Sequence, residues 1–127
     1  MAHIVILDDV EDVGIMVKRI LERKGHRVAV FTEEELAVAY VRSHEVDAAI
    51  LDIKLKKMTG IDVLEEMQNH SPRTRVIMLT GYPTLETARE SLKRGALEYL
   101  IKPVEKRELE EKVERVLEGP GGPDPGR

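Results

Sequence analysis

Residues 46–52 read Val-Asp-Ala-Ala-Ile-Leu-Asp, a short and mostly apolar stretch that ends on an acid. Comparable apolar runs recur along the chain at 4–7, 28–31, 76–79 and 98–101. Runs this short and rich in β-branched residues are typical of strands buried on both faces of a parallel sheet. We therefore predict five strands, the third of which ends at that acid.

Amphipathic helices are expected to follow these strands. Apolar residues recur at helical spacing in the segments 13–21, 36–40, 61–67, 85–92 and 105–117. Gly25 and Gly95 come after two of these segments and are expected to end the helices. The second helix is preceded by Thr32-Glu33-Glu34-Glu35, a capping-box pattern in which Thr32 would cap the helix. The Leu and Met residues are interpreted as core residues.

The alternation of five strands with five helices decides the fold class. It favours an α/β domain with an open parallel sheet and helices on both faces. The flavodoxin-like strand order 2-1-3-4-5 is the simplest arrangement among the few that sequence rules allow. We expect this domain to span residues 1–118. The Gly/Pro-rich residues 119–127 are expected to form a disordered tail or the start of a linker.

Composition limits the classes of function. A chain of 127 residues has room for one core. Its formal net charge of −4 provides no attraction to nucleic acid or anionic membranes, so direct nucleic-acid binding is not expected. The absence of cysteine excludes disulfides and thiolate metal sites. The apolar N-terminal run is too short for a signal peptide or a membrane span, and a cytoplasmic protein is expected.

Polar residues stand where four of the predicted strands end. Asp8 and Asp9 follow the first strand, Asp52 the third, Thr80 the fourth and Lys102 the fifth. Ligands of open α/β sheets bind outside these carboxyl ends, near the point where the strand order reverses. In the order 2-1-3-4-5 the first and third strands are neighbours, so the three acids are expected to converge.

Three carboxylates so close together need a compensating cation. Mg²⁺ is the natural candidate, because it prefers oxygen ligands and retains waters and phosphate oxygens. Lys102 is long enough to reach the acids, and Thr80 is placed to donate a hydrogen bond to the same oxygens. A nucleophilic carboxylate, a metal, a cation and a hydroxyl donor together favour phosphoryl transfer. Each residue alone is more often a helix cap, a strand residue or a surface residue.

The motifs around these residues resemble the response-regulator receiver family of two-component signalling. They are Ile-Val-Ile-Leu-Asp-Asp at 4–9, Ala-Ile-Leu-Asp-Ile at 49–53, Val-Ile-Met-Leu-Thr-Gly-Tyr at 76–82 and Glu-Tyr-Leu-Ile-Lys-Pro at 98–103. The resemblance covers residues 2–118. It implies a signalling switch rather than an enzyme, phosphorylated by a sensor histidine kinase or phosphotransfer protein. A downstream protein or a fused output domain would receive the signal.

The resemblance also implies a metal site and a phosphoacceptor. Asp52 would accept the phosphoryl group. Mg²⁺ would be coordinated by Asp9, Asp52 and the backbone carbonyl of Lys54, with Asp8 in the outer shell.

Further roles are implied for residues after the fourth and fifth strands. Thr80 and Tyr99 match the switch pair of the family, and Lys102 matches its phosphoryl-contacting lysine. The Lys102–Pro103 peptide bond matches one that is cis in the family.

The loop after Asp52 departs from the family pattern. A Met-Pro pair is common there, and this chain has Leu55-Lys56 instead. Lys54, Lys56 and Lys57 crowd the loop and are interpreted as a solvated face. The departure leaves the phosphoryl lifetime and the choice of partner open.

Three alternatives remain. A haloacid-dehalogenase-type phosphatase also forms an aspartyl phosphate, but needs a second Asp at position 54, which is Lys. A flavin-binding protein is disfavoured because the acidic residues 8–12 would repel a flavin phosphate. A receiver that is no longer phosphorylated is disfavoured because every required residue is present.

The four histidines lack the spacing of metal ligands and are expected at the surface. They are His3, His26, His44 and His70.

Overall fold

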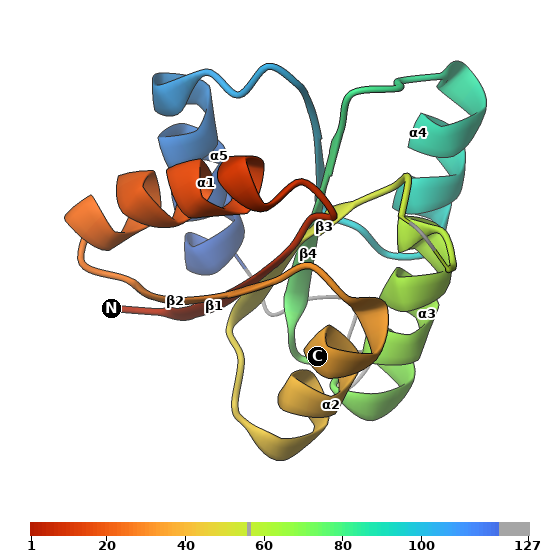
Figure 1. The fold of residues 1–127 in the computed structure, drawn as a ribbon, viewed down its shortest axis with the longest axis horizontal. Coiled ribbons are helices and arrows are strands. Elements are labelled where there is room, and N and C mark those ends of the chain that lie inside the picture. The colour runs from red at the N-terminus through yellow and green to blue at the C-terminus, as the bar shows by residue number, and fades with distance from the viewer. Residues whose placement is uncertain (56, 120–127) are drawn as a thin grey trace.

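The computed structural model describes residues 1–55 and 57–119, which form a five-stranded parallel sheet in the order β2-β1-β3-β4-β5 (Figure 1). This is the predicted strand order. The strands are β1 (His3–Leu7), β2 (Arg27–Phe31), β3 (Ala48–Asp52), β4 (Arg75–Thr80) and β5 (Glu98–Ile101). The predicted tail lies outside the described residues apart from Gly119, and so does Lys56.

Five helices cover both faces of the sheet, as predicted. They are α1 (Glu11–Arg23), α2 (Glu34–Ser43), α3 (Gly60–His70), α4 (Leu85–Lys93) and α5 (Lys106–Glu118). Helices α1 and α5 lie together on one side of the sheet, and α2 and α3 lie on the other (Figure 1). Among the described residues, no helix is both long and apolar enough to cross a membrane.

Side-chain alternation along the strands divides the core into two layers. In β1, Ile4 and Ile6 pack towards α1 and α5, whereas Val5 and Leu7 pack towards α2 and α3. Successive side chains of a strand point to opposite faces, so a strand that is apolar at every position fills both layers. This explains why the strand runs carry no polar alternation.

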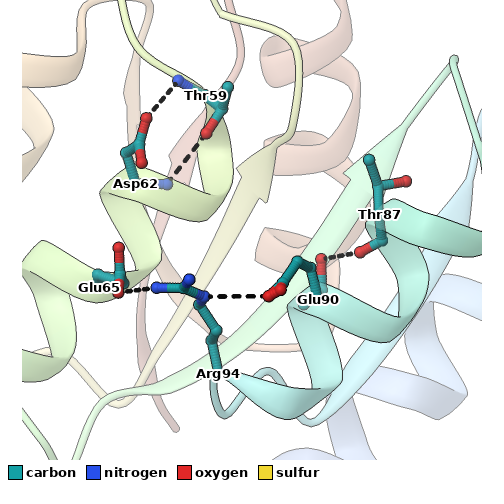
Figure 2. A network of polar contacts seen from close by, with 7 residues as sticks. Thr59, Asp62, Glu65, Thr87, Glu90 and Arg94 are labelled. Carbon is teal, nitrogen blue, oxygen red and sulfur yellow. Dashed lines mark hydrogen bonds and ion pairs between the residues drawn. The ribbon is translucent and has the colours of Figure 1, made fainter.

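The start of α3 is capped as its sequence allows. The Thr59 hydroxyl accepts a hydrogen bond from the Asp62 N–H, and the Asp62 carboxylate accepts one from the Thr59 N–H (Figure 2). At the end of the neighbouring helix α4, the Arg94 guanidinium pairs with Glu65 of α3 and Glu90 of α4 (Figure 2). These contacts tie α3 and α4 together.

The predicted capping box at the start of α2 was wrong. The helix begins at Glu34, with Glu33 in the capping position and no capping hydrogen bond from the Glu33 side chain to a described residue. The carboxylate of Glu34 instead accepts hydrogen bonds from the loop after β3. Glu34 therefore bonds to a loop residue 23 positions along the chain, Lys57, and does not form part of a local cap.

The interpretation of every Leu and Met as a core residue was also wrong. Leu85 and Leu92 of α4 are 68% and 53% exposed, and Leu36 of α2 is 56% exposed. Helix α4 packs at the edge of the sheet, beside β5, so much of its apolar surface stays uncovered.

The surface expectation fails for His3, which is 9% exposed. Its Nε2 lies 2.6 Å from the Tyr40 hydroxyl, and its Nδ1 lies 3.0 Å from the Glu45 carbonyl oxygen. The stacked rings of Tyr40 and His44 lie beside it. His3 is the first residue of β1, which has strands on both sides, and α2 covers this end of it.

Candidate functional site

Three carboxylates meet at the carboxyl ends of β1 and β3. One oxygen atom from each of Asp8, Asp9 and Asp52 lies within 4.8 Å of the others. Asp8 and Asp52 are buried, and Asp9 is half-buried. The predicted convergence of the acids is therefore what the fold produces.

Strand register explains this convergence. β1 and β3 are adjacent, and Leu7 pairs with Leu51. Asp8 and Asp52 each come one residue later, so they lie side by side at this edge of the sheet. The apolar residues before them hold both backbones in the core, which leaves the carboxylates little freedom to move apart.

Lys102 joins the cluster from beyond β5, two strands away from β3. Its ammonium nitrogen lies 2.8 Å from Asp8 Oδ2 and 3.3 Å from Asp52 Oδ2. The aliphatic part of the Lys102 side chain passes beside Gly81 on its way to the acids. The Lys102–Pro103 peptide bond is cis.

The electrostatics of the cluster shift two pKa values. Burial, and after it the charge of the neighbouring Asp8, raise the pKa of Asp52 to about 6 against the opposing effect of Lys102. Burial alone would lower the pKa of Lys102, but its contacts with Asp8 and Asp52 outweigh burial and raise it. The ammonium therefore stays charged, and it does not fully compensate the carboxylates.

The donor set fits a hard divalent cation. Asp8 Oδ1 accepts a hydrogen bond from the Val10 N–H at 2.9 Å, and Asp52 Oδ1 accepts a longer one from the Lys54 N–H at 3.3 Å. Asp8 Oδ2 is buried and accepts no well-aligned hydrogen bond from the described residues, although Lys102 faces it. Carboxylate oxygens with spare acceptor capacity and excess negative charge suit Mg²⁺.

Lys54 lies in the loop that follows Asp52. An isolated antiparallel bridge joins Lys54 to Thr59, and the Gly60 N–H donates to the Ile53 carbonyl at 2.6 Å. Coordination of a metal by the Lys54 carbonyl stays a prediction. The Lys54 side chain turns away, with its ammonium 4.3 Å from the centre of the Tyr82 ring.

The predicted switch residues flank the cluster on β4 and β5. Thr80 is fully buried, and its hydroxyl accepts a hydrogen bond from the Tyr82 N–H at 3.0 Å. Tyr99 is half-buried, with its hydroxyl directed to Thr87 of α4. Their response to phosphorylation stays a prediction.

Glu34 is a residue near the site that the sequence analysis missed. It is 3% exposed and contacts the loop that carries Lys54. Its local sequence does not distinguish it from Glu33 and Glu35, because the contact depends on how α2 packs beside the sheet.

Comparison with known families agrees with this geometry. A profile of the response regulator receiver domain matches residues 4–114. The chain belongs to the response regulator receiver family. This receiver is thereby a component of phosphorelay signalling, and the membership decides against the phosphatase and flavoprotein alternatives.

Several sequence relatives of the receiver are much longer proteins. The regulatory protein AtoC of Escherichia coli (strain K12) is 35% identical over 116 residues, which cover 91% of this chain and 25% of AtoC. The nitrogen assimilation regulatory protein NtrX of Azorhizobium caulinodans is 32% identical over 93% of this chain and 27% of its own. The receiver thus spans about a quarter of these relatives.

Solved structures share its fold. A CheY-like receiver domain protein from Methanospirillum hungatei JF-1 has a TM-score of 0.88 and 35% identity, covering 92% of this chain and 94% of its own. The response regulator TrrA from Thermotoga maritima, solved in complex with Mg²⁺ and BeF, has a TM-score of 0.83 and 28% identity. It is matched over its full length and over 92% of this chain.

Proposed function

We propose that this receiver accepts a phosphoryl group on Asp52 from a sensor histidine kinase or phosphotransfer protein. The observation that carries the proposal is the convergence of Asp8, Asp9 and Asp52 with the Lys102 ammonium between two of them. An isolated cap or surface acid would not need a half-buried lysine from two strands away.

The chemistry follows from this arrangement. A carboxylate oxygen of Asp52 forms a bond to phosphorus as the bond between phosphorus and the donor imidazole nitrogen breaks, and the imidazole leaves with the electron pair. Lys102 is placed to pair with a phosphoryl oxygen, and Thr80 to donate a hydrogen bond to another. Mg²⁺, when bound, supplies positive charge against the acids and the phosphoryl oxygens.

Named residues are proposed to hold the metal. Asp9, Asp52 and the Lys54 carbonyl would coordinate it directly, and Asp8 would act from the outer shell. The Lys102 ammonium lies closer to Asp8, at 2.8 Å, than to Asp52, at 3.3 Å, which supports an outer-shell role for Asp8. The ionised form of Asp52 is the nucleophile, and a nearby Mg²⁺ would lower its pKa.

The output is proposed to be a change in protein binding. Movement of Thr80 and Tyr99 would alter the surface formed by α4, β5 and α5, where a downstream protein or fused output domain would bind. The greater length of AtoC and NtrX supports a fused domain in those relatives.

We propose that the chain is a switch rather than an enzyme and that it acts in the cytoplasm. Residues 1–118 are proposed to be its functional unit, and residues 119–127 a tail or linker.

Labelling with a small phosphodonor tests the acceptor. With Mg²⁺, intact-mass analysis should show one added phosphoryl group, which EDTA should prevent. Asp52→Asn should abolish labelling, whereas Asp12→Asn, at an exposed acid of α1, should not. An Asp52→Asn protein labelled at the wild-type rate would overturn the assignment.

A further inference from the structure

Glu34 is a buried acid of α2 that holds the loop following Asp52. Its Oε2 atom accepts a hydrogen bond from the Lys57 N–H at 2.6 Å and a second from the Met58 N–H at 3.1 Å. The residue is 3% exposed. A buried carboxylate is costly unless it is well hydrogen-bonded, so these two bonds account for the position of Glu34.

The electrostatics agree with a permanent ionic anchor. Burial alone would raise the pKa of Glu34, but the backbone hydrogen bonds outweigh burial and hold the pKa below its usual value. The carboxylate is thus ionised at neutral pH. Charge-assisted hydrogen bonds to backbone N–H groups are stronger than neutral ones.

The neighbouring Glu35 provides a natural comparison. Its carboxylate pairs with the Lys57 ammonium at 2.9 Å, and its side chain is 67% exposed. Exposed pairs of this kind contribute little to stability. Both acids therefore contact Lys57. Glu34 binds its backbone N–H, and Glu35 pairs with its solvated ammonium group.

The anchored segment is connected to the metal site through a short closed loop. Lys57 and Met58 lie between Lys54 and Thr59, which form the isolated antiparallel bridge. Fixing the backbone at 57–58 therefore restricts the backbone at Lys54. The Lys54 N–H in turn donates to Asp52 Oδ1.

We infer that Glu34 is a positioning residue, which orients the Lys54 carbonyl towards the metal through its hold on the loop. The inference rests on the proposed function, because it assigns Glu34 to the Mg²⁺ site proposed above. It makes the α2 N-terminus a determinant of metal affinity, and through the metal, of phosphorylation rate. Outer contacts that orient metal ligands have this effect in other metal sites.

Calorimetric titration with Mg²⁺ tests the inference on the full chain. Glu34→Ala should weaken Mg²⁺ binding about tenfold or more, as loss of a ligand-orienting contact does elsewhere. Glu35→Ala, the matched control, should bind Mg²⁺ as the wild type does. NMR of the metal-free proteins should show the Lys57 and Met58 amides displaced in Glu34→Ala and retained in Glu35→Ala.

A conservative variant separates positioning from folding. Glu34→Gln keeps an oxygen that accepts both N–H bonds but removes the charge, so its Mg²⁺ affinity should lie between those of the wild type and Glu34→Ala. If Glu34→Ala does not fold, Glu34→Gln should still bind Mg²⁺ several-fold more weakly than Glu35→Gln, since hydrogen bonds to charged groups are the stronger kind. Equal affinities in that pair would overturn the inference.

The outcomes distinguish the inference from the proposed function. In one outcome the wild type binds Mg²⁺ and is labelled on Asp52 while folded Glu34 variants show the same Mg²⁺ affinity and labelling. That result overturns the role of Glu34 and leaves the proposed function in place. A wild type that neither binds Mg²⁺ nor accepts phosphoryl groups overturns the proposed function and the inference with it.

Discussion

The hydroxyl oxygen of Tyr99 lies 2.9 Å from that of Thr87, which joins β5 directly to α4. Tyr99 is thereby held to the helix whose Leu85 and Leu92 are exposed. Rotation of the Tyr99 ring away from Thr87 would break this hydrogen bond. The Thr87–Tyr99 pair is thus a structural connection between β5 and an uncovered apolar surface.

We predict that a phosphoryl mimic moves Tyr99. Beryllofluoride with Mg²⁺ places acceptor atoms near Thr80, and a shift of its hydroxyl towards them opens space behind β4 for the ring. NMR should show changes at the Tyr99 ring and at the amides of residues 84–105. The Tyr40 ring, at the opposite end of the sheet, is the internal control. If signals around Asp52 shift while Tyr99 and α4 do not, this surface does not carry the output.

The roles of the two adjacent acids predict unequal losses of metal affinity. Asp9→Ala should weaken Mg²⁺ binding more than Asp8→Ala, because Asp9 is proposed to be the direct ligand and Asp8 pairs with Lys102. Calorimetric titrations of both variants at the same pH provide the comparison. Equal losses, or a larger loss for Asp8→Ala, would show that the two roles are assigned wrongly.

The meeting of polar residues at the strand ends could be predicted because it depends on local patterns. Apolar runs define where strands end, and a parallel sheet brings those ends to one edge. Once the strand order was chosen, the meeting of Asp8, Asp9 and Asp52 followed, and so did the reach of Lys102. The order itself came from the simplest arrangement of five units, and the structure confirms it.

What could not be predicted depends on contacts between distant segments. Glu34 was assigned to a local capping pattern, and its actual partners are residues of another loop. Helical spacing identified Leu85 and Leu92 as apolar, but spacing carries no information on whether a neighbour covers them. His3 was expected at the surface because a single residue at the start of a strand has no pattern that reports burial.

Gly60 is predicted to tolerate no side chain. A Cβ at this position would lie 2.8 Å from the Ile53 Cα and would collide with the Asp52 carbonyl, and relief of either contact would displace the backbone of Asp52 or Ile53. Gly60→Ala should lower the free energy of unfolding by about 2 kcal/mol, in the range of other overpacking substitutions. Urea denaturation followed by circular dichroism measures this change. Gly119→Ala, whose Cβ would meet nothing closer than 3.4 Å, should have little effect, and equal losses in both variants would contradict the prediction.

Asp52→Asn should stabilise the metal-free protein, and by an amount that depends on pH. The pKa of Asp52 is raised from 3.8 to about 6 on folding, so between these values the folded state binds more protons than the unfolded state. Stability from this group therefore falls as pH rises from about 4 to 6 and stays low above that range.

Asparagine does not titrate, so the advantage of Asp52→Asn should be absent below about pH 4 and reach about 1–3 kcal/mol at pH 7, at about 1.4 kcal/mol per pKa unit. Urea denaturation in EDTA across this range measures the difference, in which acids distant from Asp52 cancel because both proteins contain them in the same surroundings. Saturating Mg²⁺ should remove the advantage, since the metal stabilises the ionised wild type by mass action. A difference that is constant from pH 4 to 7 would mean that Asp52 is not destabilised by its burial beside Asp8.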